Sequence, residues 1–220
     1  MKTLNLLISL ILLGIFISCG DDETEVVKQD PLYPLAVGNS WTYDNTNYNG
    51  GNPNTTTTQT TVQSSYTIDG KTGFALSEYI EGNPISLIKN DNNGNTVEYL
   101  FNNNKFVHNT IVFKKDVKKG DSWIRKSAVF TDDDNSQYEI EEWEMTCITS
   151  DTIITTPKGD FQCIGYSYHP GGKQENGDPN HTMIDYLSEK IGLVKSLHYE
   201  HENANSWLFR EIVLKDYSLQ

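Results

Sequence analysis

The hydrophobic positions of the chain follow two different patterns. Residues 4–17 form an almost continuous apolar run, in which eleven of fourteen residues are apolar. From residue 35 onward, short stretches rich in valine, isoleucine, threonine and aromatic residues alternate with clusters of asparagine, glycine and aspartate. The second pattern is typical of β-strands joined by tight turns. The sequence therefore predicts a short apolar leader followed by a β-rich body.

Short strands are expected throughout this body, at a spacing of about ten residues. We expect them near residues 40–48, 58–68, 73–80, 85–90, 95–101, 105–113, 121–130, 137–148, 151–155, 160–168, 182–188, 193–200 and 206–217. Hairpin turns are predicted at residues 91–94, 102–104 and 156–159, because Asn and Gly tolerate positive φ and Pro presets its own φ. A parallel sheet would need crossover helices, and no helical period separates these stretches.

Alternation within the stretches supports a sheet with a buried face. Trp143, Met145 and Cys147 share one face, and residues 206–217 are apolar on both faces, which predicts a central strand. A sheet of about twelve strands must curl to hide its edges. The predicted fold class is therefore all-β, a single antiparallel meander-type curved sheet that closes to a half-barrel, a barrel or a sandwich.

The apolar leader has the proportions of a secretory signal. Lys2 precedes the apolar residues 6–17, and this run is shorter than the ~20 residues that a membrane-spanning helix needs. The small Ser18 followed by Cys19 resembles the lipobox of bacterial lipoproteins, in which the cysteine is lipidated and becomes the new amino terminus. We thus expect a signal peptide at 1–18, lipidated Cys19 with a flexible acidic tether over 19–34, and a β domain over 35–220.

Lipidation would make the membrane the first partner of this chain. Two or more acyl chains, palmitate among them, hold a protein stably at a bilayer. The acidic run at residues 20–23, which reads GDDE, resembles the surface-export signal of Bacteroidota lipoproteins, and a solvated acidic tether is the alternative. The expected localisation is the bacterial cell envelope, as an outer-membrane lipoprotein with either a periplasmic or a surface-exposed domain.

Composition narrows the classes of partner. The chain has 30 Asp and Glu against 17 Lys and Arg, which gives a net charge of −13. A nucleic-acid-binding protein needs a basic stripe to replace phosphate counterions, so no nucleic acid is expected. The 36% of hydrophobic residues is enough for one globular core.

Three motifs of the body resemble a family of Bacteroidota lipoproteins. They are the opening at residues 34–43, which reads PLAVGNSWTY, the hairpin at 156–163, which reads TPKGDFQC, and the closing IGLVK at 191–195. The resemblance implies an all-β domain, of the half-barrel kind found in lipoprotein carriers. It implies no catalytic residues.

The remaining cysteines and acids provide two candidate structural sites. Cys147 and Cys163 form an even pair in an oxidising compartment, so either a disulfide or two buried free thiols are expected. Asp132 and Asp134 belong to the densest acidic cluster and are weak candidates for Ca²⁺, although Gln137 stands where a calcium loop needs glycine. The alternative is a solvated strand edge, and no other metal site is expected.

Aromatic residues provide the remaining binding candidates. Tyr43 and Tyr48 lie in or beside an Asn-rich segment and are expected to be exposed, where rings stack on sugars or line an apolar groove. The alternative places most aromatic rings in the core. No nucleophile elbow, phosphate-binding loop, zinc motif or dinucleotide fingerprint occurs, so no cofactor is expected.

These observations favour a lipid-anchored envelope protein without enzymatic activity. Its β domain is expected to bind a ligand or partner, either a surface glycan or polymer or an apolar small molecule carried inside a half-barrel. A hydrolase that uses a pair of carboxylates, or a purely structural surface lipoprotein, are the alternatives.

Overall fold

The computed structural model describes residues 30–49, 52–76, 86–130, 138–170, 180–202 and 205–220. The twelve strands of this part are β1 Ser40–Asn47, β2 Asn54–Ile68, β3 Lys71–Leu76, β4 Ser86–Asn90, β5 Thr96–Asn102, β6 Lys105–Phe113, β7 Ser122–Phe130, β8 Tyr138–Thr156, β9 Gly159–Tyr168, β10 His181–Ser188, β11 Gly192–Glu202 and β12 Asn205–Ser218. No helix in this part is long and apolar enough to cross a membrane. The predicted all-β class is confirmed.

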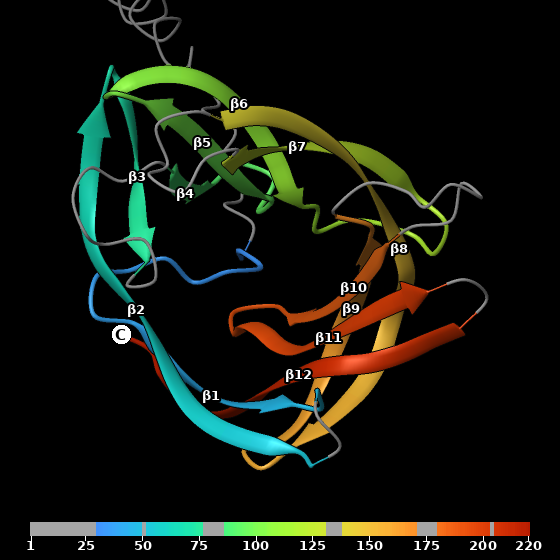
Figure 1. Ribbon diagram of the computed structural model, residues 1–220. Coiled ribbons are helices and arrows are strands. Elements are labelled where there is room, and N and C mark those ends of the chain that lie inside the picture. The colour runs from blue at the N-terminus through green and yellow to red at the C-terminus, as the bar shows by residue number, and fades with distance from the viewer. Residues whose placement is uncertain (1–29, 50–51, 77–85, 131–137, 171–179, 203–204) are drawn as a thin grey trace, which may run out of the picture.

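All twelve strands belong to one antiparallel sheet that is nearly closed into a barrel (Figure 1). The strand order is β6-β5-β4-β3-β2-β1-β12-β11-β10-β9-β8-β7. Two meanders of six strands, β1–β6 and β7–β12, are therefore joined where the first strand pairs with the last. The sequence predicted a central position for residues 206–217, and β12 lies in the middle of the sheet order.

The two ends of this order, β6 and β7, meet through side chains. The Trp123 indole Nε1 donates to the carbonyl oxygen of Ile111 at 3.0 Å, and the Lys126 amide donates to Thr110 Oγ1 at the same distance. No backbone ladder between β6 and β7 is present among the described residues. We call this junction the seam.

The two meanders begin with the same local structure. Gly38 and Gly120 each stand two residues before the first strand of a meander, with φ of +94° and +95°. The Gly38 amide donates to the Val62 carbonyl at 2.8 Å, and the Gly120 amide donates to the Cys147 carbonyl at 2.7 Å. Glycine is required at both positions because residues with a side chain rarely adopt this positive φ. Each glycine begins a Gly-x-Ser-Trp motif, at residues 38–41 and 120–123, and the two motifs occupy equivalent positions in the two halves.

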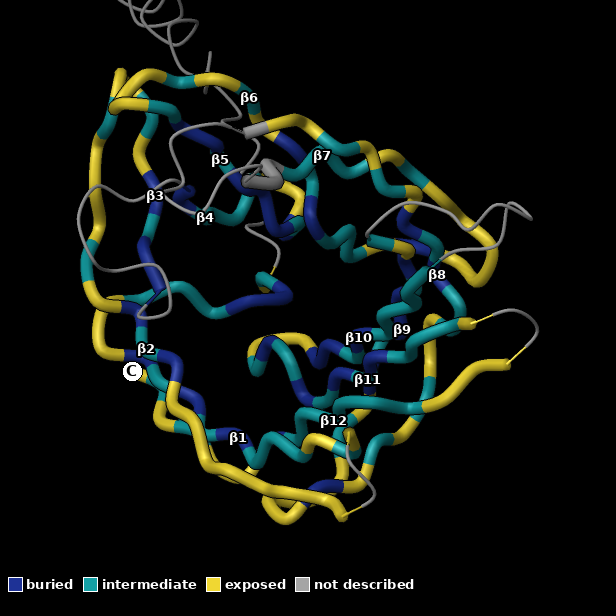
Figure 2. The backbone as a smooth tube through the Cα atoms, in the orientation of Figure 1, coloured by how far each residue is buried: buried dark blue, intermediate teal, exposed yellow. Residues whose placement is uncertain are grey.

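Buried residues lie mainly on the inner side of the curved sheet, and the outer side is largely exposed (Figure 2). Trp41 and Tyr166 are fully buried, and the Trp41 indole donates to the Ile191 carbonyl at 2.6 Å. The segment that precedes β1 also belongs to this core, since Leu32 is fully buried and the Tyr33 ring packs 4.9 Å from the Trp41 ring. The sequence predicted that the β domain begins at residue 35. In the structure it begins earlier, because Leu32 and Tyr33, which were assigned to the tether, pack in its core.

One strand is longer than the sequence predicted. The strands expected at 137–148 and 151–155 form a single strand, β8. Its register with β9 shifts on both sides of Thr149, so irregular pairing accommodates the polar residues that indicated a break. The turns expected at 91–94, 102–104 and 156–159 are present, with positive φ at Gly94, Asn103, Asn104 and Gly159.

Candidate functional site

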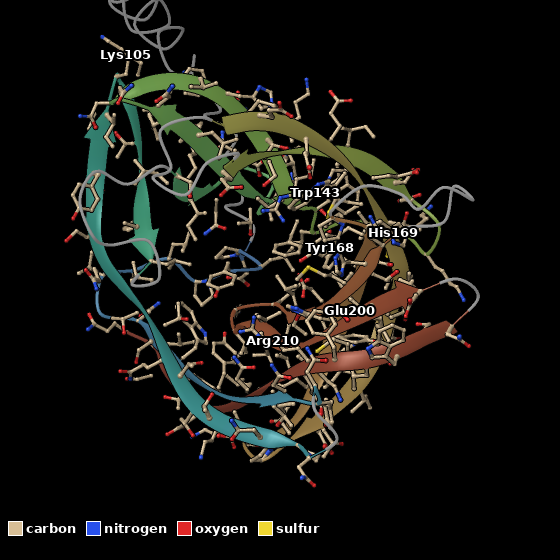
Figure 3. All side chains as sticks on the ribbon, in the orientation of Figure 1. Lys105, Trp143, Tyr168, His169, Glu200 and Arg210 are labelled. Atoms are coloured by element: carbon tan, nitrogen blue, oxygen red, sulfur yellow. The ribbon has the colours of Figure 1, made fainter. Side chains whose placement is uncertain are left out.

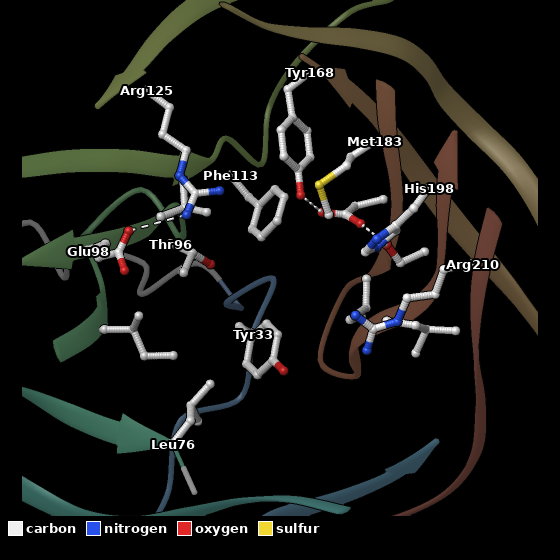
Figure 4. Close-up of a pocket in the computed structure, with 16 residues that line it drawn as sticks. Tyr33, Leu76, Thr96, Glu98, Phe113, Arg125, Tyr168, Met183, His198 and Arg210 are labelled. Carbon is white, nitrogen blue, oxygen red and sulfur yellow. Dashed lines mark hydrogen bonds and ion pairs between the residues drawn. The ribbon is translucent and has the colours of Figure 1, made fainter. Parts of the chain in front are cut away.

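A cavity of about 340 Å³ lies inside the curve of the sheet (Figure 4). Nine strands, β3–β7 and β9–β12, contribute side chains to its lining, and Tyr33 enters it from the segment before β1. The near closure of the sheet thus creates the cavity, which no single hairpin contains. Its volume lies at the lower end of the range for small-molecule pockets.

Nine of the sixteen lining residues are apolar or aromatic. These residues are Tyr33, Leu76, Ile88, Val112, Phe113, Tyr168, Met183, Leu193 and Ile212. Val112 is buried on β6, and Leu76 is buried at the end of β3. Such a surface is suited to the apolar part of a ligand, because the transfer of apolar groups from water into apolar surroundings is favourable.

A hydrogen-bonded network of polar residues occupies the wall formed by β9, β10 and β11. Asp185 and Ser196 are directly opposite each other on β10 and β11, and Ser196 Oγ donates to Asp185 Oδ1 at 2.5 Å. The Tyr168 hydroxyl donates to Asp185 Oδ2 at 2.9 Å. Ser196 Oγ also lies 2.9 Å from His198 Nε2, two residues further along the same face of β11. Both oxygens of the buried carboxyl are therefore satisfied within the protein.

Burial changes the acidity of two members of this network. It raises the pKa of the Asp185 carboxyl, and the hydrogen bonds from Ser196 and Tyr168 partly offset that rise. Burial, followed by the positive charge of Arg210, lowers the pKa of His198 to about 4. His198 is thus neutral near pH 7.

Arg125 and Glu98 form a second polar group beside the seam. The guanidinium of Arg125 lies 3.3 Å from the Glu98 carboxylate, and their side chains are only 15% and 9% exposed. The Arg125 guanidinium also lies 5.2 Å from the centre of the Trp143 ring. The charges of this pair balance each other at the cavity wall.

Arg210 and Thr96 contribute polar atoms of a different kind. Arg210 Nε donates to the Asn45 side chain at 2.9 Å, and its guanidinium points into the cavity (Figure 4). Thr96 is 3% exposed, and its hydroxyl has no hydrogen-bond partner among the described residues. A buried hydroxyl without a partner is unfavourable, so this atom marks a place where a ligand or a water would complete the bonding.

The Ser196–His198 contact does not form a nucleophile activated by a relay. In such a relay a carboxylate accepts a hydrogen bond from the histidine ring nitrogen that does not contact the nucleophile. Here Asp185 bonds to the serine instead, and within the described chain His198 Nδ1 has no carboxylate partner. The depressed pKa of His198 also disfavours the imidazolium that such a step would form.

The tyrosines proposed from the sequence as ligand-binding residues are not part of this cavity. Tyr43 is only 4% exposed, and its hydroxyl donates to the Leu193 carbonyl at 3.2 Å. Its expected exposure was wrong, because alternation along β1 turns Tyr43 and Trp41 toward the same core. Tyr48 is half-buried, and its hydroxyl donates to Glu211 Oε2 at 2.9 Å.

Cys147 and Cys163 are both free and buried in the structure, which matches the free-thiol alternative. Cys147 pairs with Tyr166, and Cys163 pairs with Thr152. The two cysteines are thus separated by three positions of β9, about 10 Å along a strand, which is too far for a disulfide. Burial raises the pKa of both thiols, that of Cys163 to about 12.

Two predicted sites lie outside the described residues. These are the lipidation site Cys19 and the weak Ca²⁺ candidates Asp132 and Asp134. In the ranges that the structure describes, no group of three or more His, Cys, Asp or Glu residues is arranged to hold a metal ion.

Sequence reasoning missed the two arginines of the cavity. The chain has fifteen lysines and only two arginines, Arg125 and Arg210, and both line the cavity. Figure 3 places Arg210 inside the curve of the sheet, whereas Lys105 projects from its outer end. The rarity of arginine in the sequence was the available signal, since arginine is favoured over lysine where a fixed, planar set of donors is needed.

Comparisons with known proteins leave the family of the chain open. No protein-family model matches it, and no curated protein matches it significantly.

Two crystal structures match the chain at low sequence identity. One is described as a "putative lipoprotein" from Parabacteroides distasonis, with 15% identity over 86% of this chain and 99% of that chain and a TM-score of 0.38. The other is described as a "putative exported protein with YmcC-like fold" from Bacteroides fragilis, with 13% identity over 87% of this chain and 100% of that chain and a TM-score of 0.42. At these values the similarity carries no functional argument.

Proposed function

We propose that this chain is a lipid-anchored cell-envelope protein whose β domain binds a small amphipathic molecule inside the nearly closed sheet. The sequence supports the envelope location through its apolar leader, Ser18 and Cys19. The observation that carries the binding proposal is the cavity of about 340 Å³ with apolar and polar lining residues. Pockets of this composition bind small molecules, because the apolar wall supplies affinity and a few polar groups fix orientation.

The lining favours a ligand with two chemical parts. Leu76, Ile88 and Val112 offer apolar surface, whereas Thr96 and Arg210 offer hydrogen-bond donors that face the same space. A purely apolar molecule would leave the Thr96 hydroxyl without a partner. A sugar would leave the apolar residues of the wall against polar atoms. An amphipathic molecule satisfies both kinds of residue.

The burial of the aromatic rings favours this interior site over a glycan-binding outer face. Trp41 and Tyr43 are buried, and Trp123 and Trp143 pack against the core. Among the described tryptophans, only Trp207 is classed as exposed, at 40%. A ring must be accessible to stack on a glycan, and these buried rings are not.

The hydrolase alternative is less well supported. Of the carboxylates that line the cavity, Glu98 is paired with Arg125, and both oxygens of Asp185 accept hydrogen bonds from Ser196 and Tyr168. A general base or nucleophile needs a carboxylate that reaches the substrate. We therefore assign the site to binding without chemical conversion.

A pair of matched substitutions on β6 tests the proposal. Val112→Phe enlarges a buried side chain that lines the cavity, and Val107→Phe makes the same change at an exposed position of the same strand. Both would be made in residues 19–220 carrying Cys19→Ala, so that no attached acyl chain competes for the cavity. The ligand is N-phenyl-1-naphthylamine, an uncharged dye that fluoresces in apolar surroundings.

The unsubstituted chain should bind the dye, and Val107→Phe should bind it equally well. Val112→Phe should weaken binding at least about tenfold, since it fills space that the dye needs. A thermal melt shows that each variant is folded, and Ile88→Phe replaces Val112→Phe if the latter is not. Equal binding by folded Val112→Phe, or no binding by the unsubstituted chain, would overturn the proposal. Methyl decanoate recovered intact after incubation would support binding over hydrolysis.

A further inference from the structure

The two arginines of the chain line one cavity but are held by different partners. Arg125 is neutralised by Glu98 at 3.3 Å. Arg210 is held by the uncharged side chain of Asn45, which accepts from Nε at 2.9 Å. No carboxylate in the described part of the chain forms an ion pair with Arg210. Arg210 is therefore the cavity's cation without a protein counter-ion in that part.

The bond to Asn45 fixes the direction in which Arg210 can donate. A guanidinium presents its donors in one plane, so anchoring Nε orients both terminal nitrogens as well. Figure 4 shows this end of the side chain directed into the cavity. A planar pair of donors matches the two oxygens of a carboxylate or a phosphate. Arg210 thus has the geometry of an anion receptor.

The other acids of the cavity do not compete for this position. Asp185 uses both of its oxygens to accept from Ser196 and Tyr168. Glu98 is engaged with Arg125 at the seam. The positive charge of Arg210 acts on the cavity wall, where it disfavours protonation of His198. An anion brought by a ligand would compensate this charge in surroundings where water screens it less than at the surface.

We propose that the molecule bound in the cavity carries an anionic head group, a carboxylate or a phosphate, which the terminal nitrogens of Arg210 hold while its apolar part packs against the walls. This inference rests on the proposed function and specifies the class of ligand. The chain has a net charge of −13, so its overall electrostatic field repels anions. Selection of an anionic ligand therefore requires a local cation such as Arg210. Thr96 remains available for a second polar atom of the ligand.

Four ten-carbon amphiphiles distinguish the head groups. They are decanoate, decyl phosphate, 1-decanol and decylammonium, each used to displace N-phenyl-1-naphthylamine from residues 19–220 carrying Cys19→Ala. The two anions should bind at least about tenfold more tightly than the alcohol, and the ammonium should bind most weakly. The anion that binds more tightly shows whether the site prefers a carboxylate or a phosphate.

Substitutions of Arg210 test the assignment to this residue. Arg210→Gln should weaken binding of the preferred anion at least about tenfold and leave binding of 1-decanol within about twofold. Asn45→Ala retains the charge but frees the guanidinium, so it should weaken anion binding by a smaller factor. Lys105→Gln removes a positive charge from an exposed side chain outside the cavity and should change neither affinity.

The outcomes separate the two proposals. If the dye does not bind to the unsubstituted chain, the proposed function fails. If the dye and 1-decanol bind but the anions bind no better than the alcohol, the cavity is a ligand site and the inference about the anionic head is wrong. The same conclusion follows if folded Arg210→Gln retains full preference for the anions. Asn45→Ala supplies the comparison if Arg210→Gln does not fold.

Discussion

Arg125 on β7 forms an ion pair of 3.3 Å with Glu98 on β5, and this contact spans the junction between the two ends of the sheet. The two strands are not neighbours, because β6 lies between β5 and the seam. The pair is largely buried, with side chains 15% and 9% exposed. Together with the hydrogen bonds of Trp123 and Lys126, it holds β7 against the first meander and so maintains one wall of the cavity.

Removal of one partner of this pair should destabilise the fold. Arg125→Leu leaves the buried Glu98 carboxylate without its cation, and breaking a buried pair in this way costs about 3 kcal/mol or more. Urea unfolding measures the loss as a lower midpoint. The double variant Arg125→Leu with Glu98→Leu should regain most of it, because neither member of the pair is then left as a buried charge without its partner. A single variant as stable as the unsubstituted chain would show that the pair does not hold the seam.

Acid should destabilise the protein through His198. Its pKa is about 4 in the folded protein and about 6.5 in the unfolded chain, so the unfolded state binds the additional proton between these values. The free energy of unfolding should thus fall as pH falls from about 6.5 to about 4, by an amount on the order of 3 kcal/mol from this group. Asp185 acts in the opposite direction, because its raised pKa makes the folded state bind its proton more tightly.

Comparison with His198→Gln isolates this contribution. Glutamine retains a donor toward Ser196 but does not titrate. Urea unfolding at about pH 7 and about pH 4 should show a smaller loss of stability in the variant than in the unsubstituted chain. The same loss in both proteins would show that another group causes the acid sensitivity.

The two cysteines should be unreactive in the folded protein. Burial raises the pKa of both thiols, and only the thiolate reacts rapidly with disulfide reagents. Ellman's reagent should therefore modify neither Cys147 nor Cys163 rapidly under native, non-reducing conditions. In concentrated guanidinium chloride, the chain with Cys19→Ala should release the colour of two thiols. No colour after denaturation would mean that the pair is bridged.

Local chemistry predicted most of the sheet. The Asn103–Asn104 turn and the positive φ at Gly94 follow from residues that tolerate this conformation. Alternation placed Met145 and Cys147 on one face, and both are fully buried. The division of β8 was wrong because a shift in strand register is a property of the pairing, which the residues of one strand do not determine.

The candidate site depended on contacts that have no local pattern. Its residues come from nine strands, and Arg125 and Glu98 meet only because the sheet nearly closes. Tyr33 was assigned to the tether since no periodicity precedes Pro34, yet it packs against Trp41 in the core. Ser196 and His198 are two residues apart on β11, so alternation places both on the same face, inside the sheet.

A crystal structure of the chain grown with decanoate tests the central claim most directly. We predict that the alkyl chain lies inside the curved sheet against Val112 and Ile212, with its carboxylate within hydrogen-bond distance of the terminal nitrogens of Arg210. Decanoate bound only on the outer face, or an interior without ligand at a concentration that saturates the solution assay, would contradict the account.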